Sequence, residues 1–128
     1  MKDQIRIAIC EDLPAEAEHL RTLITDAEGL TQIEVFESGE AVREADPAGR
    51  FELVFLDIYM TGMTGVETAK RLRRLDERCT LVFTTTSKEH ALEGFQVHAL
   101  QYLIKPLEAS AVAAVLEQVR RNLIAEVG

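Results

Sequence analysis

Residues 52–65 read ELVFLDIYMTGMTG, and this stretch decides the fold. Four apolar residues, Leu53 to Leu56, lead directly into one acid, Asp57, and two glycines follow soon after. A continuous apolar run of this length is typical of a strand buried on both faces, as in a parallel sheet covered by helices. Because an unpaired buried charge is costly, Asp57 must lie at an edge of the sheet, be paired, or be used chemically.

Strand-like and helix-like segments alternate on both sides of this stretch. Strands are predicted at residues 5–10, 33–36, 53–57, 80–86 and 101–106, and helices at residues 13–29, 38–45, 65–76, 88–95 and 108–126. The apolar spacing predicts three inner helix faces: Leu13, Ala17, Leu20, Ile24 and Ala27; Val66, Ala69, Leu72 and Leu75; and Val112, Val115, Leu116, Val119 and Leu123. Ser38 is the expected N-cap of the second helix. The pattern predicts an open, doubly wound α/β sandwich, in which ligands bind at the carboxyl ends of the strands.

Length and composition limit the possible classes of protein. The 128 residues suit one domain, expected over residues 1–128 with its core at about residues 5–124. No apolar run reaches 18 residues and the N-terminus does not resemble a signal peptide, so we expect a cytoplasmic protein without membrane contact. A formal net charge of −8 argues against direct binding of nucleic acid. The basic cluster at residues 70–78 is best interpreted as a solvated helix face, with a partner or phosphate site as the alternative.

The cysteines and histidines show no pattern of a metal or redox site. Cys10 and Cys79 are far apart in the sequence, lack a CxxC spacing, and are predicted to be buried free thiols. His19, His90 and His98 have no companion ligands at helical spacing, so none is predicted to bind a metal.

The predicted strand ends carry most of the chemically useful side chains. The first strand leads into Glu11 and Asp12, the third ends at Asp57, the fourth ends in a run of threonines at residues 84–86, and the fifth ends at Lys105. Three clustered carboxylates repel each other, and a hard divalent cation such as Mg²⁺ relieves that repulsion. The set therefore indicates phosphoryl chemistry, with one carboxylate as the nucleophile. Taken alone, Asp12 could equally be a helix N-cap before Pro14.

The pairs Glu11-Asp12 and Lys105-Pro106, with Asp57 and Thr85 between them, together resemble the receiver domain of two-component response regulators. The resemblance covers roughly residues 5–124. It implies the flavodoxin-like (βα)5 fold, with a five-stranded parallel sheet in the order 2-1-3-4-5. A narrower similarity lies in KEHALEGFQVHALQYLIKPL (residues 88–107), which looks like receivers that precede a LytTR-type DNA-binding domain.

The resemblance implies a role for each matching residue. Asp57 would be the phosphoacceptor for a sensor histidine kinase. The Mg²⁺ ligands would be Asp12, Asp57 and the backbone carbonyl of Tyr59, with Glu11 as a further ligand or the holder of a metal-bound water. The phosphoryl group would be bound by Lys105 and Thr85, and the switch aromatic would be Tyr102. The accessory positions are Thr86, beside the phosphoryl group, and Pro106, whose peptide bond with Lys105 is expected to be cis.

The implied function is a phosphorylation switch. Thr85 would move toward the phosphoryl group, Tyr102 would turn inward, and the face of the fourth helix, fifth strand and last helix would change and favour a homodimer. DNA would be contacted only through an output domain outside this chain. The sequence departs from the family at Thr61, where a proline is usual, at Thr86, where a smaller residue is commoner, and at Gln101.

Three other functions fit the sequence less well. A phosphohydrolase of the haloacid-dehalogenase type needs a second acid two residues after the nucleophile, where this chain has Tyr59. A flavodoxin-like electron carrier needs a phosphate-binding loop after the first strand, where EDLPAE (residues 11–16) would repel a phosphate. A receiver that works without phosphorylation is disfavoured because every acid, Thr85 and Lys105 are present.

Overall fold

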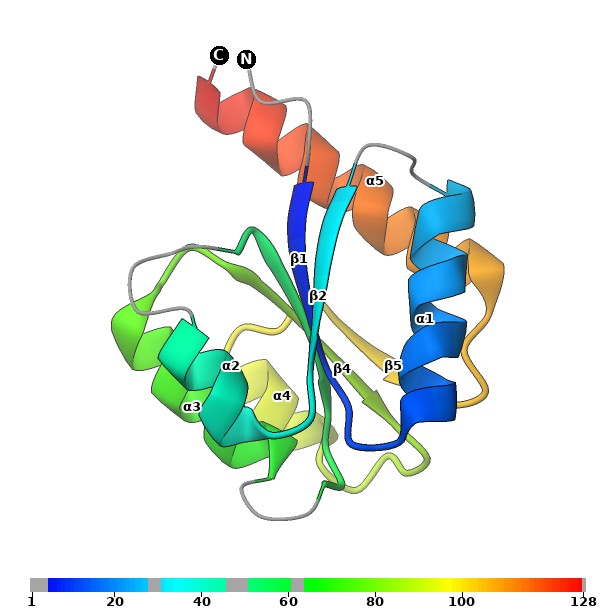
Figure 1. The fold of residues 1–128 in the computed structure, drawn as a ribbon. Helices are drawn as coiled ribbons and strands as arrows, with labels where there is room; N and C mark the ends of the chain where they lie inside the picture. Colours follow the sequence, from blue (N-terminus) through cyan, green and yellow to red (C-terminus); the bar gives the residue numbers. More distant parts are fainter. Residues whose placement is uncertain (1–4, 28–30, 46–50, 61–63, 128) are drawn as a thin grey trace.

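The computed structural model describes residues 5–27, 31–45, 51–60 and 64–127, and these residues form the predicted alternating architecture (Figure 1). The elements are β1 (Ile5–Cys10), α1 (Pro14–Ala27), β2 (Thr31–Phe36), α2 (Gly39–Ala45), β3 (Leu53–Asp57), α3 (Gly65–Leu75), β4 (Thr80–Thr85), α4 (Ala91–Gln96), β5 (Gln101–Ile104) and α5 (Ala109–Val127). The strands form one parallel sheet in the order β2-β1-β3-β4-β5. The predicted doubly wound fold and strand order are confirmed.

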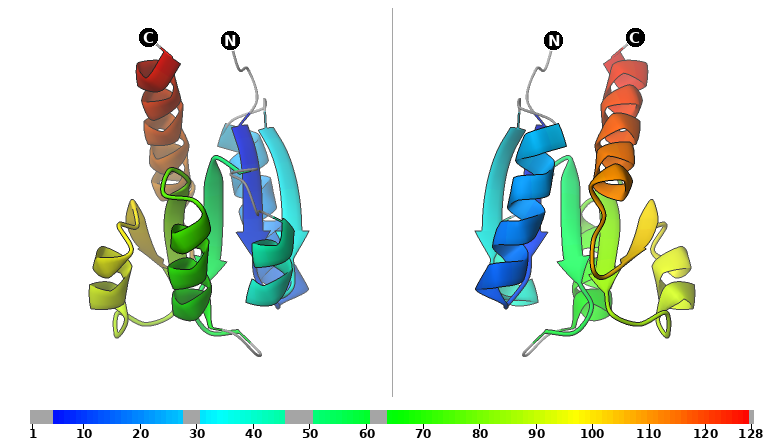
Figure 2. Two further views of the ribbon diagram at one scale, coloured as in Figure 1. Left: turned by 90° about the vertical axis from the view of Figure 1, so that its left-hand side faces the viewer. Right: turned by 90° about the vertical axis from the view of Figure 1, so that its right-hand side faces the viewer.

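The sheet is the middle of three layers. Helices α1 and α5 cover one face, and α2, α3 and α4 cover the other (Figures 1 and 2). Successive strand residues point to opposite faces. Thus Ile7 and Ile9 pack in the cluster with α1 and α5, while Ala8 and Cys10 pack in the cluster with α2 and α3. Full burial of a large apolar side chain stabilises the fold by about 1.5–3 kcal/mol, which explains why the central strands are apolar without interruption.

The ends of several elements differ from the prediction. Leu13 precedes α1 and is 52% exposed, Leu75 in the last turn of α3 is 50% exposed, and Ala27 at the end of α1 is also exposed. Helical spacing therefore marks a buried face only along the part of a helix that lies against the sheet. Helix α4 begins at Ala91, later than predicted, and the amide of His90, its N-cap residue, donates a hydrogen bond to the Tyr102 hydroxyl.

Local hydrogen bonds fix the helix ends. The Ser38 hydroxyl accepts a hydrogen bond from the Ala41 amide, as expected of an N-cap, and the Thr64 hydroxyl caps α3 by accepting from the Glu67 amide. Among the described residues, no helix combines the length and apolar character needed to span a bilayer.

One member of the basic cluster has a structural role that the sequence did not indicate. The guanidinium of Arg73 donates to the carbonyl oxygens of Val97 and Cys79, at 2.9 and 2.7 Å, and so links α3 to the end of α4 and the start of β4. The interpretation of this cluster as a solvated face is therefore wrong for Arg73, although Lys70 and Arg74 are exposed.

Candidate functional site

The backbone brings four strand ends to one rim of the sheet. Asp57 lies opposite Thr84 in the β3–β4 register, and Thr85 lies opposite Ile104 in the β4–β5 register. The Lys105 amide continues this alignment past the end of β5 by donating a 2.7 Å hydrogen bond to the Thr85 carbonyl. The parallel pairing thus delivers Asp57, Thr85 and Lys105 to one place.

Three acids and one lysine meet at this rim. Glu11, Asp12 and Asp57 each offer a carboxylate oxygen within 4.8 Å of the others, and Glu11 and Asp57 are buried. The ammonium nitrogen (Nζ) of Lys105 lies 2.8 Å from Glu11 Oε1 and 3.5 Å from Asp57 Oδ2. The lysine is therefore the basic partner of Asp57. It lies 48 residues further along the chain, so the sequence around Asp57 did not indicate it.

The crowding of these charges shifts their pKa values. Burial raises the pKa of Glu11 to about 7, with a further rise from the hydrogen bond and charge of Asp57 that the Lys105 ammonium offsets in part. Burial alone would lower the pKa of Lys105, but the hydrogen bonds to Glu11 and Glu16 outweigh it and raise this pKa. Burial, with Glu11 and Asp57 nearby, also raises the pKa of the Cys10 thiol to about 12, so this buried free thiol stays protonated.

The donor set fits a hard divalent cation. Carboxylate oxygens are the ligands that Mg²⁺ prefers, and it usually takes one or two of them together with waters and phosphate oxygens. The pKa of Glu11 is raised first by burial and then by the nearby Asp57, and a cation at this rim would oppose both causes by stabilising the charged carboxylate. Lys105 lies closer to Glu11, at 2.8 Å, than to Asp57, at 3.5 Å, so Asp57 together with Asp12 could hold the ion with less competition from the lysine.

The other side of the rim is formed by the segment between β4 and α4. The Thr85 hydroxyl is fully buried and accepts a hydrogen bond from the Ser87 amide at 3.2 Å. The Tyr102 hydroxyl donates to the Ser87 carbonyl at 2.7 Å and accepts from the His90 amide at 3.2 Å. Tyr102 is half-buried and packs against the Phe83 ring. The two predicted switch residues thus both bind the segment that leads into α4.

The residue two positions after Asp57 reaches the same segment. Tyr59 is exposed; its hydroxyl donates to Glu89 at 3.1 Å, and its ring contacts that of His90 edge-on. Its amide lies 3.4 Å from Asp57 Oδ1.

The remaining predicted positions lie around this rim. Thr86 is exposed, and the Lys105–Pro106 peptide bond is cis, as the resemblance implies. Thr61 lies outside the described residues.

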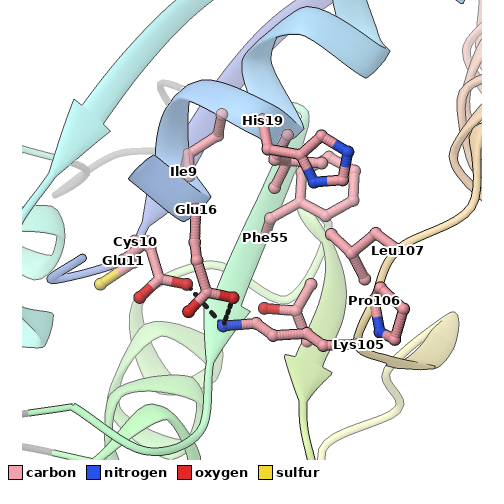
Figure 3. A pocket seen from close by; sticks show the side chains of 11 residues that line it. Ile9, Cys10, Glu11, Glu16, His19, Phe55, Lys105, Pro106 and Leu107 are labelled. Atoms are coloured by element: carbon pink, nitrogen blue, oxygen red, sulfur yellow. Dashed lines mark hydrogen bonds and ion pairs between the residues drawn. The ribbon is translucent and has the colours of Figure 1, made fainter. Parts of the chain in front are cut away.

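The sequence analysis missed Glu16, which lies in the first turn of α1. Its Oε1 is 2.9 Å from the Lys105 ammonium, so the lysine is held by one acid from the end of β1 and one from α1 (Figure 3). The signal was present in the sequence, because the first turn of a helix that follows a parallel strand starts at the ligand-binding rim. EDLPAE was recognised only as an acidic loop that would repel a phosphate.

A known protein family matches most of this chain. The model of the response regulator receiver domain matches residues 7–117. The chain belongs to this family. Receiver domains are signalling phosphoacceptors of two-component systems, in agreement with an acidic rim and a buried aspartate at the end of the third strand.

Individual relatives agree with this membership. An uncharacterized response regulatory protein of Vibrio cholerae is 32% identical over 124 residues, which cover 96% of this chain and 48% of that protein. The sensory transduction protein LytT of Enterococcus faecalis is 29% identical over 119 residues, which cover 93% of this chain and 49% of that protein. The chain thus spans about half the length of these relatives, and the LytT match confirms the narrower resemblance to LytTR-type receivers.

A solved structure shows the same fold. The receiver domain of AraT, a response regulator from Geobacillus stearothermophilus, superposes with a TM-score of 0.86 at 24% identity, covering 97% of this chain and 98% of that one.

Proposed function

We propose that this receiver accepts a phosphoryl group on Asp57 from the phosphohistidine of a sensor histidine kinase, in a reaction that requires Mg²⁺. The observation that carries the proposal is the position of Asp57: a buried carboxylate that ends a central strand, 3.5 Å from a buried ammonium and beside two more acids. Such an arrangement serves stability poorly, since packed apolar residues are often equally stable or more so.

The residues of this chain supply attack and charge compensation. An Asp57 carboxylate oxygen attacks phosphorus and forms the new O–P bond, while the P–N bond breaks and its electron pair stays on the imidazole nitrogen, which then takes a proton. Lys105 pairs with the negative oxygens of the transferred group, and Thr85 donates its hydroxyl to one of them. Asp12, Asp57 and the backbone carbonyl of Tyr59 would hold the Mg²⁺, with Glu11 as a ligand or the holder of its water, and the bound ion would neutralise further phosphoryl charge.

Phosphorylation is proposed to alter the segment between β4 and α4. To donate to the phosphoryl group, the Thr85 hydroxyl has to move toward it, and so draws away from the Ser87 amide, whose hydrogen bond it now accepts. Displacement of this segment removes the Ser87 carbonyl from the Tyr102 hydroxyl and also strains the hydrogen bond from the His90 amide, after which Tyr102 turns inward. A local charge change thereby biases a two-state element, α4 and its preceding segment.

The α4–β5–α5 face is proposed as the dimerisation surface of the phosphorylated protein. Leu92 and Phe95 on α4 are 68% and 80% exposed, and Ile104 at the end of β5 is 36% exposed. Leu92 and Phe95 are three residues apart and so lie on one side of α4, and exposed apolar side chains grouped in this way mark interaction surfaces. The output is proposed to be control of transcription by a DNA-binding domain joined to the receiver, since the relatives are about twice as long as this chain.

The test is to incubate the protein with phosphoramidate and Mg²⁺ and weigh the intact chain. We expect the added mass of one phosphoryl group on the wild type, none on Asp57→Asn, and none when the metal is chelated. Light scattering of the labelled protein then reports dimer formation, with Phe95→Ala as the interface variant. An unlabelled wild type, or equal labelling of Asp57→Asn, contradicts the proposal.

A further inference from the structure

Lys105 is held mainly by two acids that are not the phosphoacceptor. Its ammonium lies 2.8 Å from Glu11 and 2.9 Å from Glu16, and Figure 3 shows both carboxylates directed at it. The distance to Asp57, 3.5 Å, is longer than a strong charge-assisted hydrogen bond. A lysine ammonium has three donors, so two of them are engaged by Glu11 and Glu16 before any phosphoryl group arrives.

The two acids that bind Lys105 differ in their exposure to water. The Glu11 side chain is 5% exposed, whereas that of Glu16 is 40% exposed. A buried carboxylate that loses its cation is left uncompensated, which is strongly destabilising. An exposed carboxylate is solvated again at little cost. If Lys105 must free a donor, Glu16 is the partner that it can release.

Space for that exchange is present beside the lysine. A pocket of about 100 Å³ is lined by Glu16, His19, Lys105 and Leu107, among others, between α1 and the segment that follows β5. It gives the Glu16 and Lys105 side chains room to separate without displacing the sheet.

We infer that Glu16 is an exchangeable counterion of Lys105: it holds the ammonium in the unphosphorylated protein and is replaced by phosphoryl oxygens when Asp57 is modified. The inference rests on the proposed function, and makes Glu16 a positioning residue that acts through Lys105. Glu16 thus competes with the phosphoryl group for one donor. Removing it favours phosphorylation.

The test measures the rate at which phosphoramidate labels Asp57 at saturating Mg²⁺. In this reaction the new O–P bond replaces the P–N bond and ammonia leaves. We expect Glu16→Gln to be labelled about two- to fivefold faster than the wild type, which is the range that an exposed ion pair supports. Glu16→Asp keeps the charge but shortens the reach, so it should show a similar gain.

Glu18→Gln is the matched control. Glu18 is exposed on the same helix, and no ion pair joins it to Lys105 among the described residues, so this variant removes one charge without touching the lysine. We expect its rate to match that of the wild type. We also expect the rate advantage of Glu16→Gln over the wild type to shrink at about 1 M salt, where the Debye length is only about 3 Å. A purely structural role of Glu16 would show no such salt dependence.

The outcomes separate the inference from the proposed function. An unlabelled wild type contradicts the proposed function itself. If the wild type is labelled but Glu16→Gln is no faster, the exchange role of Glu16 is wrong. The same holds if Glu18→Gln matches Glu16→Gln, or if Glu16→Asp matches the wild type, because either result assigns the effect to net charge instead of contact.

Discussion

Replacing Gly65 with alanine tests how closely the first turn of α3 packs on the phosphoacceptor strand. A β-carbon at this position would lie 2.2 Å from the Asp57 carbonyl oxygen, 2.8 Å from its carbonyl carbon and 2.8 Å from the α-carbon of Ile58. All three neighbours are backbone atoms, so no flexible side chain can move aside. The Gly65 amide also donates a 3.0 Å hydrogen bond to the Ile58 carbonyl, which holds the two segments together.

The expected loss of stability follows from these contacts. Overpacking that forces backbone shifts costs about 1–3 kcal/mol. The strained hydrogen bond contributes about 1 kcal/mol more. Alanine is favoured over glycine inside a helix by about 1 kcal/mol, which offsets the contribution of the strained hydrogen bond. The free energy of unfolding should therefore fall by about 1–3 kcal/mol.

Urea denaturation measures this loss, and Gly94→Ala is the matched control. Gly94 is a buried glycine of α4, but an added β-carbon there would meet only ring atoms, 3.2 Å from Phe83 and 3.4 Å from Tyr102. This variant should stay within about 1 kcal/mol of the wild type, since helix propensity favours it. Phosphoryl labelling of Gly65→Ala should also slow by at least about tenfold. The displaced backbone carbonyl is that of Asp57, and a small misplacement of the nucleophilic residue lowers the reaction rate strongly.

A Gly65→Ala protein with wild-type urea midpoint and labelling rate would refute this reasoning. Equal losses in Gly65→Ala and Gly94→Ala would also refute it, since they would show a general intolerance of added methyl groups and no special role for the contact with Asp57.

Three further predictions follow from the site. Burial raises the pKa of Glu11 from an ordinary 4.5 to about 7, so the contribution of Glu11 to metal-free stability is fully present below pH 4.5 and falls by up to about 1.4 kcal/mol per pH unit toward pH 7. Thermal melts of the wild type and Glu11→Gln should show this difference, and Mg²⁺ should oppose the fall. Tyr102→Phe removes the hydroxyl that binds Ser87 and His90, so it should lower the free energy of unfolding measured in urea by about 1–2 kcal/mol. An unchanged urea midpoint contradicts this. The backbone of His98 is in the left-handed region, with a φ of 57°, which glycine adopts more readily than other residues. His98→Gly should therefore raise the free energy of unfolding measured in urea by about 0.5 kcal/mol, and His98→Ala should leave it unchanged.

The fold and most of the site could be predicted because both follow from the order of the strands and the parallel direction in which they run. An uninterrupted apolar strand identifies a parallel sheet, and parallel strands carry their C-terminal residues to one rim. That rule alone places Glu11, Asp57 and Lys105 together, as the structure does. Only the pattern along the chain is needed, with no knowledge of any side-chain conformation.

What the sequence could not supply depends on how side chains reach across elements. Arg73 looked like one more surface cation, yet it binds the carbonyls of Val97 and Cys79, which only the packing of α3 against the end of α4 brings near. Leu75 has the spacing of a core residue but is the last residue of α3 and is 50% exposed. Glu16 was overlooked because its ion pair joins α1 to the segment after β5.

The charges at the rim explain why the buried acid is tolerated and why it is poised to react. In the described part of the chain, the carboxylates of Glu11, Glu16 and Asp57 share the Lys105 ammonium, so these four side chains carry two excess negative charges when fully ionised and metal-free. Phosphorylation converts the Asp57 carboxylate, with one negative charge, into an acyl phosphate with up to two, and so adds up to one more. One lysine cannot compensate all of these, whether or not Glu16 releases it. Phosphorylation of Asp57 and binding of a divalent cation must therefore stabilise each other. In the unphosphorylated, metal-free site, protonation of Glu11 and the shared Lys105 ammonium limit the repulsion that these two events relieve together.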